Sequence, residues 1–145
     1  MDERQIALSN YRIQESEDSL KVAKHCFKEG LYKDSINRSY YSAFYAVKAV
    51  LAIGTIDFKR HKDVIAYFNQ HFVAKDIFER ELGRRLGRLK QLREKSDYDD
   101  FYLASREEAN GQVYTAEVLL ESIRRYLKAI IKNVDGNTGE SEGNE

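Results

Sequence analysis

The chain has 145 residues, 42% hydrophobic and 33% charged, which is enough for one domain with a buried core. Its 24 basic and 24 acidic residues balance, which excludes a global charge that would attract nucleic acid or acidic membranes and leaves only local patches for such roles. One cysteine excludes an internal disulfide, and the lack of a membrane-length apolar run or a signal-peptide core favours a soluble, cytoplasmic protein.

We expect helices along the whole domain, and the absence of proline favours long, uninterrupted ones. They are expected at about residues 2–29, 32–53, 61–72, 75–96 and 105–132. Gly30 and Gly54 are plausible stops, and Ser105 with Glu108 forms the pattern of a capping box. The sequence therefore predicts one all-α domain over residues 1–133, followed by a glycine-rich, acidic and disordered tail over residues 134–145.

The fourth helix carries a charge on its apolar face. Its apolar stripe consists of Phe78, Leu82, Leu86 and Leu89. Arg93 lies four residues beyond Leu89 and falls within this stripe, and Asp97 follows one turn later. Burying an unpaired guanidinium is costly. Arg93 therefore either leaves the core with its head in water, pairs with Asp97, or lines a polar cleft between helices or subunits.

Another face of the fourth helix is basic. The stripe consists of Arg80, Arg84, Arg88 and Lys95. Between Glu79 and Lys95 there are seven basic and three acidic residues, so this face is either simply solvated or a modest phosphate-attracting patch. Gly83 and Gly87 are expected to allow a close approach of a neighbouring helix.

The second helix has large side chains on two faces. Its core stripe is Ile36, Tyr40, Ala43, Val47, Val50 and Leu51. Arg38, Tyr41 and Tyr45 lie opposite, with Lys48 beside them. This predicts a helix covered from both sides, either inside the bundle or at a dimer interface, with a nucleotide-stacking surface as the alternative.

Four separated blocks carry a family resemblance. They read, in order, "INRSYYSAFYAVKAVLAIG", "RHKDVIAYF", "LREKSDYDD" and "SREEANGQVYTAEVLLESIRRYL". Together they resemble the HEPN family, prokaryotic helical domains often encoded beside minimal nucleotidyltransferases. The resemblance covers about residues 5–130. It implies an up-and-down bundle of four to five helices that commonly dimerises around its long helices.

The resemblance also bears on activity. Many HEPN proteins are metal-independent ribonucleases whose motif is an arginine followed, four to six residues later, by a histidine. The arginine maps onto Arg93, which would face a cleft at the dimer interface and stabilise charge on a phosphate. Those later positions hold Asp97, Tyr98 and Asp99, so the chain resembles the RxxxDY branch and lacks the usual acid–base group, unless His61 supplies it.

The first interpretation is therefore a binding and regulatory module. It would be a homodimer that works with a separately encoded nucleotidyltransferase in a toxin–antitoxin-like pair, with Arg93, Asp97 and Tyr98 at the centre of its cleft. The alternatives are an endoribonuclease that uses Arg93 and a nucleotide-binding helical domain. Further candidate binding residues, for RNA or a nucleotide, are Arg38, Tyr41, Tyr45 and His61. No metal site or cofactor is expected, because the histidines and Cys26 lack ligand spacing.

Overall fold

Five α-helices and one π-helical segment make up the described chain. The computed structural model describes residues 1–143, with side chains to residue 132, and contains no strand within that range. The elements are α1 (Glu3–Lys28), α2 (Tyr32–Ile53), α3 (His61–Phe68), η1 (Asn69–Val73), α4 (Arg80–Tyr98) and α5 (Arg106–Gly143). The predicted all-α class and the HEPN-like bundle are confirmed.

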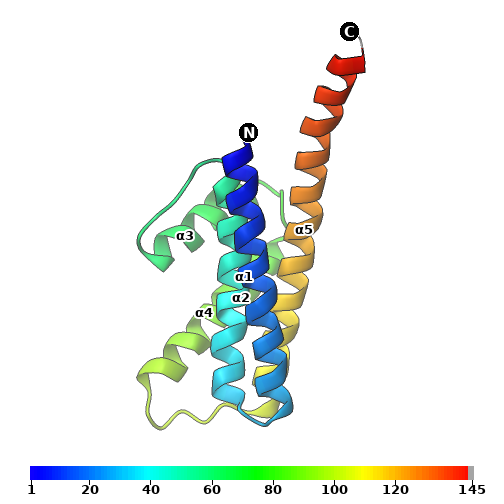
Figure 1. Cartoon of the computed structure of the whole chain (residues 1–145). Coiled ribbons are helices and arrows are strands. Elements are labelled where there is room, and N and C mark those ends of the chain that lie inside the picture. Colours follow the sequence, from blue (N-terminus) through cyan, green and yellow to red (C-terminus); the bar gives the residue numbers. More distant parts are fainter. Residues whose placement is uncertain (144–145) are drawn as a thin grey trace.

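The long helices run alongside one another, and α5 extends beyond the rest of the bundle at its C-terminal end (Figure 1). α1 packs most extensively on α2, which also contacts α3, α4 and α5. The core stripe predicted for α2 is buried, with no member more than 2% exposed. α2 is central because residues outside this stripe, such as Phe44 and Ala46, are buried as well, and one neighbouring helix could not cover them all.

Helix ends follow the local signals in most places. Gly30 has a φ of 78°, the left-handed conformation that favours glycine after a helix. The N–H of Glu108 donates to the hydroxyl of Ser105 at 3.0 Å, as expected at the start of α5. The tail predicted for residues 134–145 lies outside the part of the chain whose side chains are described, and its disorder stays a prediction.

The start of the fourth helix differs from the prediction. A helix was expected from about residue 75, but α4 begins at Arg80. Asp76 adopts a φ of 60°, and the N–H of Ile77 bonds back to the carbonyl of Phe72 at 2.9 Å. This turn interrupts the helix and directs Phe78 into the core, where it is 5% exposed. Tertiary burial of one aromatic ring therefore outweighs local helical continuity.

The face of α1 that packs on α2 is rich in serine. The hydroxyls of Ser9 and Ser16 donate to the carbonyls of Ala49 and Ser42 at 2.9 and 2.6 Å. Both serines are fully buried. Small side chains let the two helices approach closely, and each hydroxyl gains a backbone acceptor. The apolar spacing of α1 does not reveal this seam.

The two glycines inside α4 have different surroundings. A Cβ on Gly83 would lie 2.9 Å from Cγ1 of Val73 and 3.3 Å from Oδ1 of Asn69, so this glycine does allow η1 to approach. A Cβ on Gly87 would meet nothing within 4 Å. The prediction of close approach is right for Gly83 and wrong for Gly87.

Alanine at these two positions should have opposite effects on stability. Gly83→Ala should lower the free energy of unfolding by about 1–3 kcal/mol, because the new methyl group overpacks the contact with Val73. Gly87→Ala should raise it by up to about 1 kcal/mol, because alanine favours helix and has room. Urea denaturation of both variants checks this. Equal changes of the same sign would contradict it.

Candidate functional site

Arg93 lies on the side of α4 that faces α2. Its side chain is only 18% exposed. One terminal nitrogen, Nη2, donates to the Tyr41 hydroxyl at 3.1 Å. The guanidinium carbon is 4.9 Å from the ring centre of Tyr40 and 5.5 Å from that of Tyr41. Two aromatic rings and a hydroxyl from α2 therefore hold this charge, through cation–π contacts and one hydrogen bond.

Asp97 supplies the opposite charge. Its Oδ2 lies 3.0 Å from Nε of Arg93, one helical turn away, and its side chain is 32% exposed. The Nε–H of Arg93 does not point at this oxygen and makes no hydrogen bond. The contact is therefore an ion pair rather than an aligned charge-assisted hydrogen bond. The sequence left three outcomes open for Arg93. In the structure Arg93 pairs with Asp97, and its head group lies in a largely buried, polar surrounding rather than in water.

His61 belongs to the same cluster, although it lies far away in sequence. It is the first residue of α3. Its Nδ1 is 3.2 Å from the hydroxyl of Tyr40. Its ring stacks on Phe44 with centroids 4.0 Å apart and an angle of 25° between the planes. Tyr40 thus connects the histidine to the arginine, because one face of the same phenol contacts Arg93 and its hydroxyl contacts His61.

We name Arg93, Asp97, Tyr40, Tyr41 and His61 the Arg93 cluster. Burial, followed by the charges of Arg93 and Lys48, lowers the pKa of His61. Burial raises the pKa of Tyr40 to about 12, although the charge of Arg93 acts in the other direction. Near neutral pH the imidazole is therefore neutral and able to accept a proton, while Tyr40 keeps its hydroxyl hydrogen. The guanidinium can stabilise an anion, but Asp97 already balances its charge.

The lowered pKa of His61 has a consequence for stability. The folded state binds fewer protons than the unfolded state, whose histidine titrates near about 6.5, so stability should fall as pH drops through that value. Between about pH 7.5 and pH 5.5, the free energy of unfolding should fall less for His61→Asn than for the wild type. Urea denaturation at both pH values measures the difference. Parallel losses in the two proteins would contradict the assignment.

The remaining candidate residues lie outside this cluster. Tyr45 is half-buried and contacts the rings of Tyr41 and Phe44, at centroid distances of 6.4 and 6.1 Å. Arg38 is exposed and forms no ion pair within the described residues. Tyr98 is 81% exposed. The structure therefore gathers Arg93, Asp97, Tyr41 and His61, and leaves Arg38 and Tyr98 on the surface.

Sequence reasoning missed two parts of this region. Tyr40 was assigned to the core alone, yet its ring and hydroxyl join Arg93 to His61. The end of α4 and its connection to α5 also expose three large apolar side chains, Tyr98, Phe101 and Leu103, at 81%, 91% and 87%. We name these three residues the connector patch. Their run of aromatic and aliphatic residues between two helices was the available signal.

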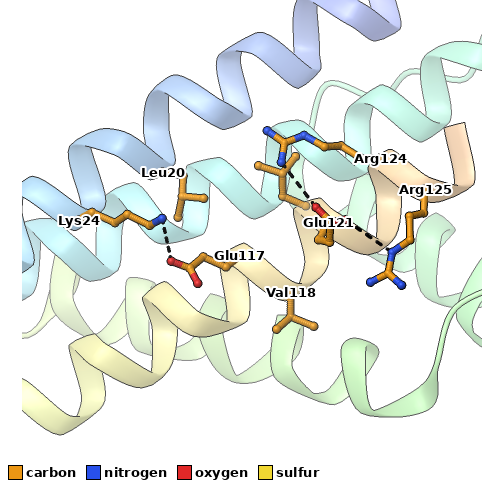
Figure 2. A pocket seen from close by; sticks show the side chains of 8 residues that line it. Leu20, Lys24, Glu117, Val118, Glu121, Arg124 and Arg125 are labelled. Atoms are coloured by element: carbon orange, nitrogen blue, oxygen red, sulfur yellow. Dashed lines mark ion pairs between the residues drawn. The ribbon is translucent and has the colours of Figure 1, made fainter. Parts of the chain in front are cut away.

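One other hollow on the surface contains charges that are already paired. Figure 2 shows this hollow between α1 and α5, where Lys24 meets Glu117 at 2.9 Å and Glu121 approaches Arg124 and Arg125. The Lys24–Glu117 pair joins the two helices and the other two pairs lie within α5, so we do not assign a site there. Within the described residues, no three His, Cys, Asp or Glu side chains are placed to hold a metal ion together, and no helix has the length and apolarity needed to cross a bilayer.

Comparisons with known proteins agree with the fold. A family model described as "HEPN domain" matches residues 9–126. Two proteins of Methanocaldococcus jannaschii that carry the name "Putative toxin" are 34% and 30% identical over 119 and 128 residues. The first match covers 82% of this chain and 88% of the relative, and the second 87% of each. A "UPF0332 protein" of Thermotoga maritima is 28% identical over 128 residues, which is 88% of this chain and 96% of the relative.

Proposed function

The chain belongs to the HEPN domain family, and from this premise we propose that it is a toxin-like binding and regulatory module that works with a separately encoded nucleotidyltransferase. The proposed place of action is the cytoplasm. Two relatives carry toxin names, which supports one half of a toxin–antitoxin-like pair. The chemistry of the Arg93 cluster and of the connector patch supports a binding role over catalysis.

The connector patch is the observation that carries this proposal. Three large apolar side chains stand almost fully in water within six residues of chain, directly after the Arg93 motif. Asp99 and Asp100 lie between them and give the patch an acidic rim. Exposed apolar groups with a polar rim mark protein interaction sites. We assign this patch to the nucleotidyltransferase, whose docking surface would then be apolar with basic residues around it.

The internal pairing of Arg93 favours binding over cleavage. Asp97 neutralises the guanidinium and would repel an incoming phosphate. The rings of Tyr40 and Tyr41 contact the guanidinium, and the Tyr41 hydroxyl occupies one of its hydrogen-bonding positions. The residue is thus already engaged within its own subunit. We propose that Arg93 and Asp97 hold α4 against α2 near a cleft shared by two subunits.

Co-purification tests the partnership. The chain would be produced together with the protein encoded by the neighbouring gene, and the complex analysed by light scattering. We expect a stable complex built on a homodimer of this chain. Each interface should remove about 800 Å² of accessible surface from each partner, as stable protein interfaces do. A monomer that binds no neighbouring nucleotidyltransferase at micromolar concentration would overturn the proposal.

One observation favours a second function, a metal-independent endoribonuclease. The fold brings the neutral imidazole of His61 into the Arg93 cluster, where it could accept the proton of a ribose hydroxyl. This function predicts that purified protein cleaves RNA in the presence of a chelator. Activity should disappear in both Arg93→Lys and His61→Asn while both variants remain folded at the assay temperature. Absence of cleavage by the wild type would exclude this alternative.

A further inference from the structure

A small cavity lies where the first turns of α1 meet the end of α2 and the connection that leads to α3. These segments lie together at one end of the bundle (Figure 1). The cavity has a volume of about 280 Å³. Leu8, Ala52 and Ile56 form aliphatic walls, and Arg12 and Asp57 are among its polar lining residues. We name it the α1–α2 cavity, and its lining residues are distinct from the Arg93 cluster and the connector patch.

A buried guanidinium lines this cavity. Arg12 is only 9% exposed, which is rare for an arginine. Its Nη1 donates to the carbonyl of Lys48 at 2.9 Å, the one hydrogen bond of this guanidinium within the described residues. The other two nitrogens, Nε and Nη2, are not sealed from solvent as the nitrogen Nε of Arg93 is. Since Arg12 lines the cavity, these two nitrogens can donate to a molecule inside it.

The ion pair of Arg12 is loose. Its Nη2 lies 3.6 Å from Oδ2 of Asp57, which is beyond hydrogen-bonding distance, and the Asp57 side chain is 61% exposed. The other oxygen of Asp57, Oδ1, accepts a hydrogen bond from the N–H of Phe58 at 2.9 Å and lies 3.7 Å from Nζ of Lys48. Water and Lys48 can therefore satisfy Asp57 without Arg12, since such exposed pairs contribute little to stability. A carboxylate that enters the cavity can replace Asp57 at the guanidinium.

The backbone beside the cavity is held in a strained conformation. Thr55 has a φ of 58°, which is unfavourable for a β-branched residue. The side-chain amide of Gln5 donates to the carbonyl of Ile53 and to the hydroxyl of Thr55, both at 2.8 Å. Strain of this kind persists only where the surrounding contacts fix the backbone. The cavity walls are thus in place before a ligand arrives, so that binding requires little ordering of the chain.

We propose that the α1–α2 cavity binds a short aliphatic carboxylate. The head group would accept two hydrogen bonds from Nε and Nη2 of Arg12, the paired geometry that suits a planar guanidinium. The chain would lie against the aliphatic walls, which would be unfavourable surroundings for a more polar anion. A water molecule takes about 30 Å³, so the volume suits a chain of about four to six carbons. The proposal does not depend on the connector patch or on the Arg93 cluster.

Titration of the ¹⁵N-labelled full chain, followed by the NMR shifts of its amides, tests the cavity. The probes are hexanoate, acetate as the head group without the chain, and hexanol as the chain without the charge. Arg12→Lys keeps the charge and removes the planar group that binds both oxygens. Asp57→Asn removes the competing carboxylate and keeps its shape. Asp18→Asn is the matched control, since Asp18 is an exposed carboxylate of α1 outside the cavity.

We expect hexanoate to bind saturably and to shift the amides of Leu8 and Ile56. Acetate should bind at least about tenfold more weakly, because each methylene that leaves water strengthens binding by about fourfold. Hexanol and the Arg12→Lys variant should each show about a tenfold loss, the effect of losing a charge-assisted hydrogen bond. Asp57→Asn should bind hexanoate about threefold more tightly than the wild type, because Arg12 is then free of its competing partner, whereas Asp18→Asn should bind unchanged.

The Asp57→Asn variant keeps the test decisive even if Arg12→Lys does not fold. Asp57 is largely exposed, so its substitution should leave the melting temperature close to that of the wild type. The proposal would be overturned if hexanoate gave no saturable shift up to about 10 mM, a concentration that detects even millimolar affinity. Equal affinities for hexanol and hexanoate would also overturn it, as would an Asp57→Asn variant that binds hexanoate no more tightly than the wild type.

Discussion

Replacing Arg93 by alanine is expected to lower the free energy of unfolding by about 2 kcal/mol. The substitution removes the hydrogen bond to Tyr41 and the contacts with two aromatic rings. It also leaves Asp97 without its counter-charge, but that side chain is 32% exposed and water can solvate it. The cost should therefore remain below the roughly 3–5 kcal/mol that follows the loss of one partner from a fully buried pair.

Thermal unfolding measures this effect. For a chain of this size the melting temperature should fall by about 4–8 °C. Arg93→Lys should lose about half as much, because lysine keeps the charge but not the planar group that stacks on the rings. Arg80→Ala is the matched control, since Arg80 is 78% exposed on the same helix and should change little. A melting temperature unchanged in Arg93→Ala would show that the cluster does not stabilise the fold and would favour a ligand-binding role.

The double substitution of Phe101 and Leu103 by serine should weaken the complex with the nucleotidyltransferase by about a hundredfold. Both side chains are almost fully exposed in the connector patch and contribute little to the core. Burial of such groups at the centre of an interface supplies much of its binding free energy, since apolar surface leaves water. The melting temperature of the isolated chain should stay as in the wild type, which separates loss of binding from loss of folding.

Leu8→Ser provides the control for this experiment. Leu8 is 42% exposed near the N-terminus of α1, and that end of the molecule lies far from the α4–α5 connection (Figure 1). The substitution removes a comparable exposed apolar group and should leave the affinity for the partner unchanged. Titration of the labelled chain with the partner, followed by fluorescence anisotropy, gives the affinities. Equal weakening by all variants would mean that the effect is general surface hydrophobicity rather than docking at the connector patch.

Local patterns were sufficient to predict the helices and their buried faces. The stripe that contains Leu86 and Leu89 is buried, and α2 covers the range expected of it. Arg93 was identified because it interrupts an apolar stripe, and its ion pair with Asp97 follows from the four-residue spacing. These features were predictable because a helix places residues three and four apart on one face, whatever lies opposite.

Contacts between distant segments could be decided only by the tertiary structure. Arg93 and Tyr41 are 52 residues apart, and His61 reaches the cluster through Tyr40 from a third helix. The same holds for the turn at Asp76 and for the different surroundings of Gly83 and Gly87. Periodicity states which face of a helix is covered, but the rotation and axial offset between helices determine which residues meet there. Those two quantities depend on the packing of all the side chains together, and no single segment contains them.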